Sequence, residues 1–328
     1  MTLSKRERLE RLMHGERADR PGVALWRHWP GDDQDPVELA RSTIAWQEQF
    51  DWDFVKVSPD SGFCVSGWGA RSRWVGNNEG NREYTLHPIQ NEADWYALQP
   101  QDPTAGRLGA QIRCLELVGE GLPKGTPFIQ TVFSPTAQVK YLAGKDRILA
   151  EIRRHPDAVI HALEVITETT LRFLEAMRHT GVAGIFFALQ LATPYELTAE
   201  EYKTFGRPYD LRILEAAREL YWFNLLHLHG ADAYFELVVD YPVPAINWHD
   251  RESEVSLAAA RERFSGALVG GLRQWDTMLR GTPDDVRAEA ADALAQTDGR
   301  GFILGTGCVT PVTAPLGNIR AVRQAVEA

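Results

Sequence analysis

Two histidines and a distant cysteine are the residues of this chain whose types and spacing best fit metal chemistry. His227 and His229 lie two residues apart at the end of an apolar run, so in a strand both imidazoles point to the same side. Cys308 follows a second apolar run near the C-terminus. Two imidazoles and one thiolate would bind a borderline-soft ion such as zinc and leave a fourth position open for substrate, as in catalytic sites.

Ordinary packing is the alternative explanation for these three residues. Buried histidines usually have hydrogen-bond partners of their own, and a free cysteine commonly behaves as a small hydrophobe. The sequence by itself therefore leaves open whether the three side chains meet at a metal ion.

Eight short apolar runs alternate with helical segments and supply the elements that would position these residues. The predicted strands are residues 23–26, 54–57, 128–133, 184–189, 223–229, 245–248, 267–271 and 302–305. Helices are expected over residues 4–14, 36–50, 198–220, 231–239, 256–264, 283–295 and 319–327. This alternation predicts a parallel sheet, and eight such units predict one (β/α)8 barrel of the TIM type over residues 1–328. A doubly wound open sheet is the alternative fold.

Residues 61–127 interrupt the regular rhythm and are expected to form an insertion. They contain several glycines, the pair Asn77–Asn78 and two prolines, which favour loops and a small hairpin, with a helix near residues 108–118. No Gly-x-Gly-x-x-Gly or P-loop pattern follows any predicted strand, which argues against nucleotide binding.

Polar side chains gather at the carboxyl ends of the predicted strands, where barrels of this kind place catalytic groups. We expect Arg27 to hold an anionic group of the substrate, because a charged residue at a barrel mouth has few structural reasons to be there. Asp60 is either a substrate-binding carboxylate or a cap that follows Pro59. The other candidates at strand ends are His28, Gln190 and Trp248 for substrate binding, with His28 and His249 as alternative ligands or acid–base groups.

Composition narrows the class of protein. The net charge is −10 and the pI is about 5.4, with no basic stripe, which argues against nucleic acid as a partner. No apolar run approaches the roughly 20 residues that span a bilayer, and the charged N-terminus lacks a signal-peptide core. Three cysteines do not suggest a disulfide framework. We expect a cytoplasmic enzyme that acts on a small molecule, and the sequence leaves a homodimer open.

Several motifs together resemble the uroporphyrinogen decarboxylase superfamily. Residues 301–311 (GFILGTGCVTP) are similar to its closing motif, and residues 245–250 resemble its Asp-Trp region. Residues 197–202, followed by Pro208 and Tyr209, are similar to its Leu-Ser-Pro-Glu segment. The resemblance covers essentially the whole chain and is strongest from residue 128 on.

One branch of this superfamily consists of zinc-dependent methyltransferases with a His-x-Cys motif and a later cysteine. His227, His229 and Cys308 stand at the corresponding positions, with His229 in place of the first cysteine. The resemblance implies a zinc ion at these residues and transfer of a methyl group between a corrinoid or small methylated donor and a thiol-like acceptor. The chain has no Asp-x-His-x-x-Gly cobalamin motif, so the corrinoid would arrive on a separate protein.

The other branch consists of cofactor-free decarboxylases that hold a carboxylated substrate with two arginines after the first strand. This chain keeps one of them as Arg27, and the family's catalytic aspartate matches Asp60. The resemblance therefore implies catalytic roles for Arg27 and Asp60, and a decarboxylase is the alternative function. A non-catalytic barrel that keeps the pocket is the third hypothesis.

Overall fold

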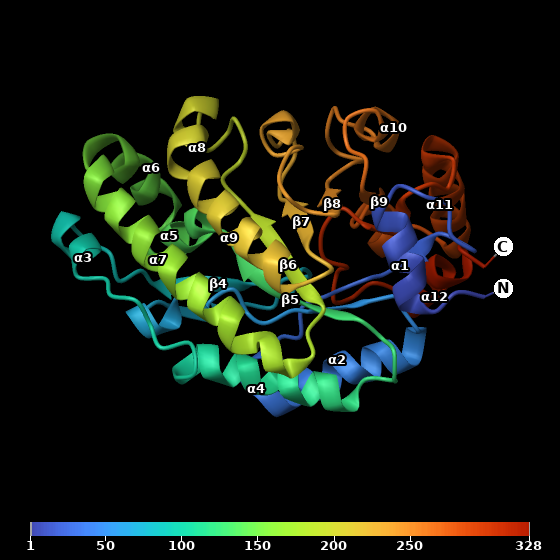
Figure 1. Cartoon of the computed structure of the whole chain (residues 1–328), viewed down its shortest axis with the longest axis horizontal. Coiled ribbons are helices and arrows are strands. Elements are labelled where there is room, and N and C mark those ends of the chain that lie inside the picture. Colours follow the sequence, from blue (N-terminus) through green and yellow to red (C-terminus); the bar gives the residue numbers. More distant parts are fainter. Residues whose placement is uncertain (1, 328) are drawn as a thin grey trace.

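The core of the molecule is a curved parallel sheet (Figure 1). The computed structural model describes residues 2–327, and within them eight strands pair in the order β1-β10-β9-β8-β7-β6-β5-β2. This order runs once around a circle without reversing, which is the order of a barrel and not of a doubly wound sheet. The strands are β1 (Gly22–Val23), β2 (Val55–Val57), β5 (Phe128–Phe133), β6 (Gly184–Leu189), β7 (Leu225–Leu228), β8 (Ala245–Trp248), β9 (Ala267–Leu272) and β10 (Phe302–Thr306). The predicted (β/α)8 barrel and its eight strands are confirmed.

Asp53 joins the two ends of the sheet, where β1 meets the segment before β2. Its backbone N–H donates to the carbonyl oxygen of Val23 at 2.9 Å, and its carboxylate accepts from the Val23 N–H at 2.8 Å. The same buried carboxylate binds Arg8 at 2.8 Å and Arg20 at 2.7 Å. The barrel is therefore held together at this point by one aspartate and not by a continuous ladder.

The helices form the outer layer of the barrel, and local signals set many of their ends. Ser4 and Glu7 form a capping box at the first helix, and Asp35 caps the second helix just before Pro36. The helices are α1 (Lys5–Met13), α2 (Pro36–Phe50), α3 (Glu92–Tyr96), α4 (Gly106–Gly121), α5 (Pro135–Ala143), α6 (Lys145–Arg154), α7 (Pro156–Ala176), α8 (Ala199–Phe205), α9 (Arg207–Leu220), α10 (Leu257–Arg261), α11 (Pro283–Thr297) and α12 (Leu316–Gln324).

Two predicted helices differ in the structure. The helix expected over residues 198–220 is divided into α8 and α9, because Pro208 lacks the N–H that an uninterrupted helix needs and instead occupies the first turn of α9. The helix expected over 231–239 is wrong, since only a short 3-10 turn forms at Phe235–Leu237. Asp232 adopts a φ of 53°, a left-handed conformation that does not continue an α-helix.

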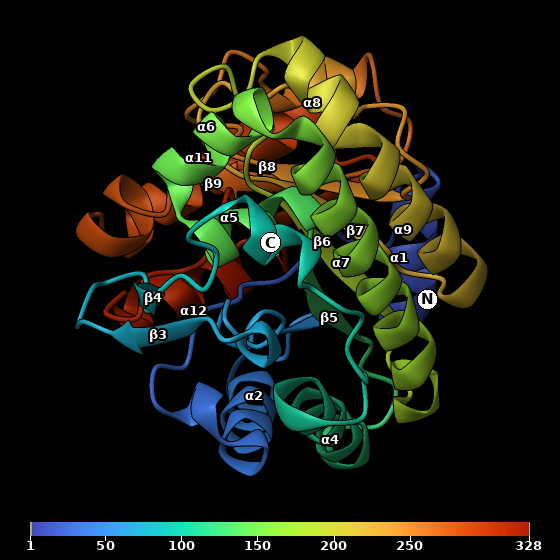
Figure 2. The same cartoon turned by 90° about the vertical axis from the view of Figure 1, so that its left-hand side faces the viewer.

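The predicted insertion contains the expected hairpin, made of β3 (Arg71–Trp74) and β4 (Arg82–Leu86). Its second half, however, is part of the barrel, because α4 packs beside α2 in the outer layer (Figure 2). The inserted segment is therefore shorter than residues 61–127. Among the described residues, none of the helices has both the length and the apolar composition to cross a bilayer. The prediction of one domain over 1–328 stays a prediction.

Candidate metal centre

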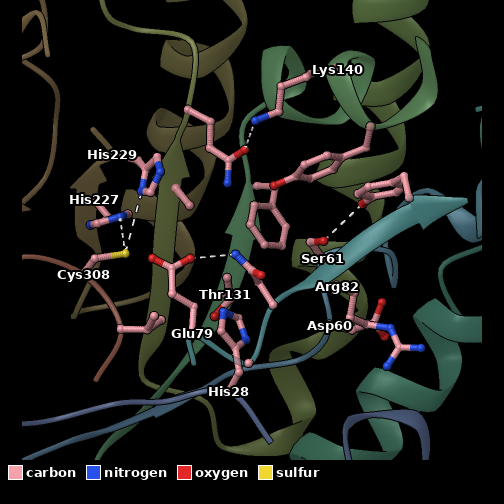
Figure 3. Close-up of a pocket in the computed structure, with 18 of the residues that line it drawn as sticks. His28, Asp60, Ser61, Glu79, Arg82, Thr131, Lys140, His227, His229 and Cys308 are labelled. Atoms are coloured by element: carbon pink, nitrogen blue, oxygen red, sulfur yellow. Dashed lines mark hydrogen bonds between the residues drawn. The ribbon is translucent and has the colours of Figure 1, made fainter. Parts of the chain in front are cut away.

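Three histidines and a cysteine converge at the carboxyl ends of the barrel strands. His227 lies within β7 and His229 just after it, His249 follows β8, and Cys308 follows β10. One ligand atom from each of the four residues lies within 4.8 Å of every other. The Cys308 sulfur is 3.8 Å from Nε2 of His227 and 3.7 Å from Nδ1 of His229 (Figure 3). Three nitrogen donors and one sulfur donor in this space suit a zinc-like ion.

His249 changes the set of donors that the sequence predicts. We expected three protein ligands and an open fourth position, with His249 only as an alternative. The structure places His249 in the same group as the other three residues, so four protein donors face one point. The signal was its position directly after a predicted strand, but nothing local distinguished it from His28, which also follows a strand.

The orientation of His227 is set by Asn247, its partner on the neighbouring strand. The Asn247 amide nitrogen donates to the carbonyl oxygens of Val269 at 2.8 Å and Thr306 at 3.1 Å, so its oxygen must face His227. That oxygen lies 2.6 Å from Nδ1 of His227, which therefore carries the proton and donates. The lone pair of Nε2 is left to face Cys308, the arrangement that a metal ligand requires.

The ring of His249 is also oriented as a metal ligand, but by a different partner. Its Nδ1 lies 3.1 Å from a carboxylate oxygen of Glu252, while its Nε2 is buried without a hydrogen-bond partner among the described residues. A buried polar atom without a partner is costly, so this atom points to a missing ligand. A carboxylate behind an imidazole is also the usual support of a metal-bound histidine.

The charge state of Cys308 reflects its histidine neighbours. Burial by itself raises the pKa of this thiol, but the neighbouring imidazoles of His227, His229 and His249 lower it well below its ordinary value. The thiolate is the form of cysteine that binds metal ions. By contrast, burial raises the pKa of Cys114 to about 12, so that cysteine stays a thiol.

Gly307 allows the loop after β10 to approach β8 closely. A Cβ at this position would lie 2.9 Å from the His249 Cα and 3.0 Å from the Trp248 carbonyl oxygen, which is too close for any side chain. The absence of a side chain at Gly307 therefore brings Cys308 next to His249.

Three of the four cluster residues line a cavity of about 610 Å³ at the mouth of the barrel. Six residues predicted for the site contribute to its wall: His28, Asp60, Gln190, His227, His229 and Cys308. Burial lowers the pKa of His28 to about 4, so this ring is neutral at physiological pH. Asp60 is ion-paired with Arg107 and accepts from the N–H of Gly62 at 2.8 Å, so its carboxylate is already occupied by the protein.

Two predicted substrate-binding residues do not contribute to the wall of this cavity. The Arg27 guanidinium lies over the ring of Trp29 at 4.9 Å and near that of Trp46 at 5.7 Å. Adjacent residues of an extended segment point in opposite directions, so His28 faces the cavity and Arg27 faces α2. Trp248 is buried and donates to the Val255 carbonyl oxygen at 2.8 Å, which makes it a packing residue.

Several cavity residues were not predicted from the sequence, among them Lys56 and Glu79. The position of Lys56 in the sequence could have indicated its place, because it is a charged residue inside the short apolar strand β2. Its side chain therefore had to face either the barrel interior or a helix. Glu79 lies in the turn of the hairpin, and no local pattern indicates that this turn reaches the barrel mouth.

Comparison with known proteins identifies one matching family and several similar proteins. The model of the family described as uroporphyrinogen decarboxylase (URO-D) matches residues 4–328. The methylcobamide:CoM methyltransferase MtbA of Methanosarcina mazei is 22% identical, over 96% of this chain and 95% of that protein. The methylcobamide:CoM methyltransferase MtaA of Methanosarcina barkeri is 24% identical, over 90% of this chain and 85% of that protein.

Solved structures share the fold. A methyltransferase from Methanosarcina mazei superposes with a TM-score of 0.82 at 18% identity, covering 99% of this chain and 98% of that one. A B12-independent methionine synthase from Shewanella sp. W3-18-1, solved with selenomethionine, has a TM-score of 0.60 at 12% identity, covering 96% and 97% of the two chains. At these identities the likeness concerns the barrel alone.

Proposed function

The chain belongs to the uroporphyrinogen decarboxylase family, and from this premise we propose that it is a zinc-dependent methyltransferase. It transfers a methyl group between a corrinoid or small methylated donor and a thiol acceptor. The observation that carries the proposal is the group of His227, His229, His249 and Cys308, whose ligand atoms lie within 4.8 Å of one another beside a cavity.

The relatives support this activity. MtbA and MtaA are named methylcobamide:CoM methyltransferases, and this chain matches nearly their whole length. A methylcobamide is a methylated corrinoid, and the chain lacks the Asp-x-His-x-x-Gly motif expected of a cobalamin-binding segment. We therefore propose that the corrinoid is presented by a separate protein at the open end of the barrel.

The residues divide the chemical work between them. A zinc ion at this centre would supply the Lewis acidity by which a thiol loses its proton near neutral pH. Cys308 contributes the anionic donor, and the three imidazoles contribute neutral ones. Asn247 and Glu252 fix the rings of His227 and His249. His227, His249 and Cys308 are buried, while His229 is partly exposed and lines the cavity. With a single thiolate donor, a bound divalent ion would leave the centre with a net positive charge, which favours an anionic sulfur.

The geometry gives less support to the alternative decarboxylase. The resemblance to that branch assigns the substrate carboxylate to Arg27, but Arg27 lies against Trp29 and Trp46, outside the cavity. Asp60, the proposed catalytic aspartate, is paired with Arg107. A decarboxylase would therefore need both residues to be rearranged.

Measured zinc content and methyl transfer test the proposal. We expect the purified chain to bind one equivalent of zinc and to methylate a thiol with methylcobalamin as donor. Cys308→Ser should weaken zinc binding by at least about 100-fold, since even loss of a supporting residue costs 10–100-fold. Cys114→Ala, which changes a buried thiol far from the cluster, is the matched control and should keep the zinc. A chain that binds no zinc, or a Cys308→Ser variant that keeps it, would contradict the proposal.

A further inference from the structure

Lys56 is a buried cation in the cavity wall with no carboxylate to balance it. Its ammonium lies 4.6 Å above the ring of Phe186 and donates to the Ser58 hydroxyl at 2.9 Å. Among residues 2–327, no acidic side chain lies within ion-pair distance of it. Burial lowers the pKa of Lys56 to about 7, although the Cys308 thiolate opposes this shift. A charge placed in this way is stabilised once an anion binds beside it.

Glu79 is an anion in the same cavity that likewise lacks a partner of opposite charge. In the described part of the chain, no cation forms an ion pair with its carboxylate. Its two oxygens accept only from amides, Asn81 at 2.7 Å and Gln274 at 3.3 Å. Burial, and then the Cys308 thiolate, raise the pKa of Glu79 above its usual range. A cation beside this carboxylate would remove the imbalance.

The hairpin turn that carries Glu79 is fixed in place. The Val312 N–H donates to the Asn78 carbonyl oxygen at 2.7 Å. A Cβ on Gly80 would lie 2.7 Å from Val312 and 2.9 Å from His28, so this turn lies directly against the loops that follow β10 and β1. Figure 3 shows the Glu79 carboxylate on the side of the cavity where Cys308 lies. Its place beside the metal centre is thus built into the fold.

We propose that the thiol acceptor of this enzyme carries both an ammonium and an acid group, that is, an amino acid with a thiol side chain. Glu79 binds the ammonium and Lys56 binds the acid group, while the sulfur faces the metal centre. Both residues line the cavity together with Cys308, and each lacks the oppositely charged partner that such a molecule provides. The inference rests on the proposed function and adds the class of acceptor to it.

The acceptor class is tested by measuring, with calorimetry, the affinity of the zinc-loaded chain for four related thiols. L-homocysteine carries both charges, 4-mercaptobutyrate lacks the ammonium, 3-mercaptopropylamine lacks the acid group, and 2-mercaptoethanesulfonate carries only an anion. A charge-assisted hydrogen bond contributes enough to change affinity by roughly tenfold. We therefore expect homocysteine to bind at least about tenfold more tightly than each of the others. This series needs no substitution and so does not depend on how any variant folds.

Two variants assign the charges. Glu79→Gln should weaken the binding of homocysteine and 3-mercaptopropylamine by about tenfold and leave the binding of 4-mercaptobutyrate unchanged. Lys56→Met should weaken the binding of homocysteine and 4-mercaptobutyrate and leave the binding of 3-mercaptopropylamine unchanged. Glu48→Gln, an exposed change on α2 outside the cavity wall, is the matched control and should alter none of them. Zinc stoichiometry is measured for every variant, because the proposal requires it to stay at one.

The possible failures can be told apart. If 2-mercaptoethanesulfonate binds as tightly as homocysteine, or if Glu79→Gln weakens all four thiols equally, the amino-acid acceptor is wrong while the methyltransferase proposal stands. If no thiol binds the zinc-loaded chain, both proposals fail.

Discussion

Among single residues, His249 has the largest consequence for the chemistry of the cluster. With it, the candidate donors are three imidazoles and one thiolate, one more than the three protein ligands of a catalytic zinc site, so a substrate thiol would bind as a further ligand or in place of one imidazole. The ring depends on Glu252, whose carboxylate lies behind Nδ1 at 3.1 Å, while the unpartnered Nε2 faces the other ligands. Metal affinity should therefore depend on a residue that never touches the metal.

Glu252→Ala tests this dependence. Removing the carboxylate leaves the ring of His249 without its support, and loss of such a partner weakens metal binding about 10- to 100-fold. Zinc affinity, measured by competition with a chelator, should fall by that amount in Glu252→Ala. Glu254→Ala, an exposed acidic change two residues away, should leave it unchanged. Equal affinities in the two variants would contradict the dependence of zinc binding on the Glu252 carboxylate.

At the scale of elements, the centre depends on how closely the loop after β10 approaches β8. β7 and β8 are neighbours in the sheet, so His227, His229 and His249 are brought together by ordinary strand pairing. Cys308 comes from β10, which is separated from β8 by β9. It reaches the histidines only because its loop crosses over the end of β9, and Gly307 is the point of contact.

Gly307→Ala should disturb the metal centre through the backbone. The added methyl would lie within 3.0 Å of the His249 Cα and the Trp248 carbonyl oxygen, and backbone atoms cannot move aside easily. We expect zinc affinity to fall by about tenfold or more, since a ligand displaced by a fraction of an ångström is comparable to a lost supporting residue. Gly317→Ala in α12, where the nearest atom would be at an ordinary 3.6 Å, is the control. If both variants bind zinc like the wild type, this loop contact does not position Cys308.

At the scale of the whole molecule, closure of the barrel depends on Asp53. Its carboxylate is fully buried and takes part in ion pairs with Arg8 and Arg20, and its backbone and side chain bind both polar atoms of Val23. Removing one partner from a buried ionic group leaves the others uncompensated, which costs about 3–5 kcal/mol.

Asp53→Asn should therefore lower the free energy of unfolding by about 3 kcal/mol, seen as a lower midpoint in urea. Glu168→Ala breaks the exposed ion pair with Arg172 and should change the free energy of unfolding by less than about 0.5 kcal/mol. An Asp53→Asn chain as stable as the wild type would mean that the barrel closes without this cluster.

Asp210 gives the molecule a pH-dependent stability. Burial raises the pKa of this carboxyl to about 7, although hydrogen bonds from Tyr202 and Tyr241 act in the other direction. A group whose folded pKa lies above its unfolded value stabilises fully at low pH, and this contribution is lost as pH rises through 7. Asp210→Asn does not titrate, so its urea midpoint relative to that of the wild type should rise between pH 5 and pH 8. A difference that stays constant over this range would contradict the assignment.

The sequence determined the barrel and most of its cluster. Apolar runs that alternate with helical segments define strands locally, so all eight strands were predicted within a few residues. Because parallel strands of a barrel end on one face, His227, His229 and Cys308 had to share that face. Helix ends were less certain, as Pro208 and Asp232 show, since a single residue's backbone conformation decides them.

Only the tertiary structure decided which way side chains point and what faces them across the cavity. Arg27 and His28 are adjacent, and their opposite orientations depend on how the segment after β1 packs against α2. His249, only an alternative ligand in the sequence, joins the cluster through its distance to the other three ligand atoms, and Glu79 reaches the cavity through the contact between Asn78 in its hairpin and Val312. These relations join residues far apart in the chain. No local pattern encodes them, because the distance between two loops is set by the packing of the whole barrel.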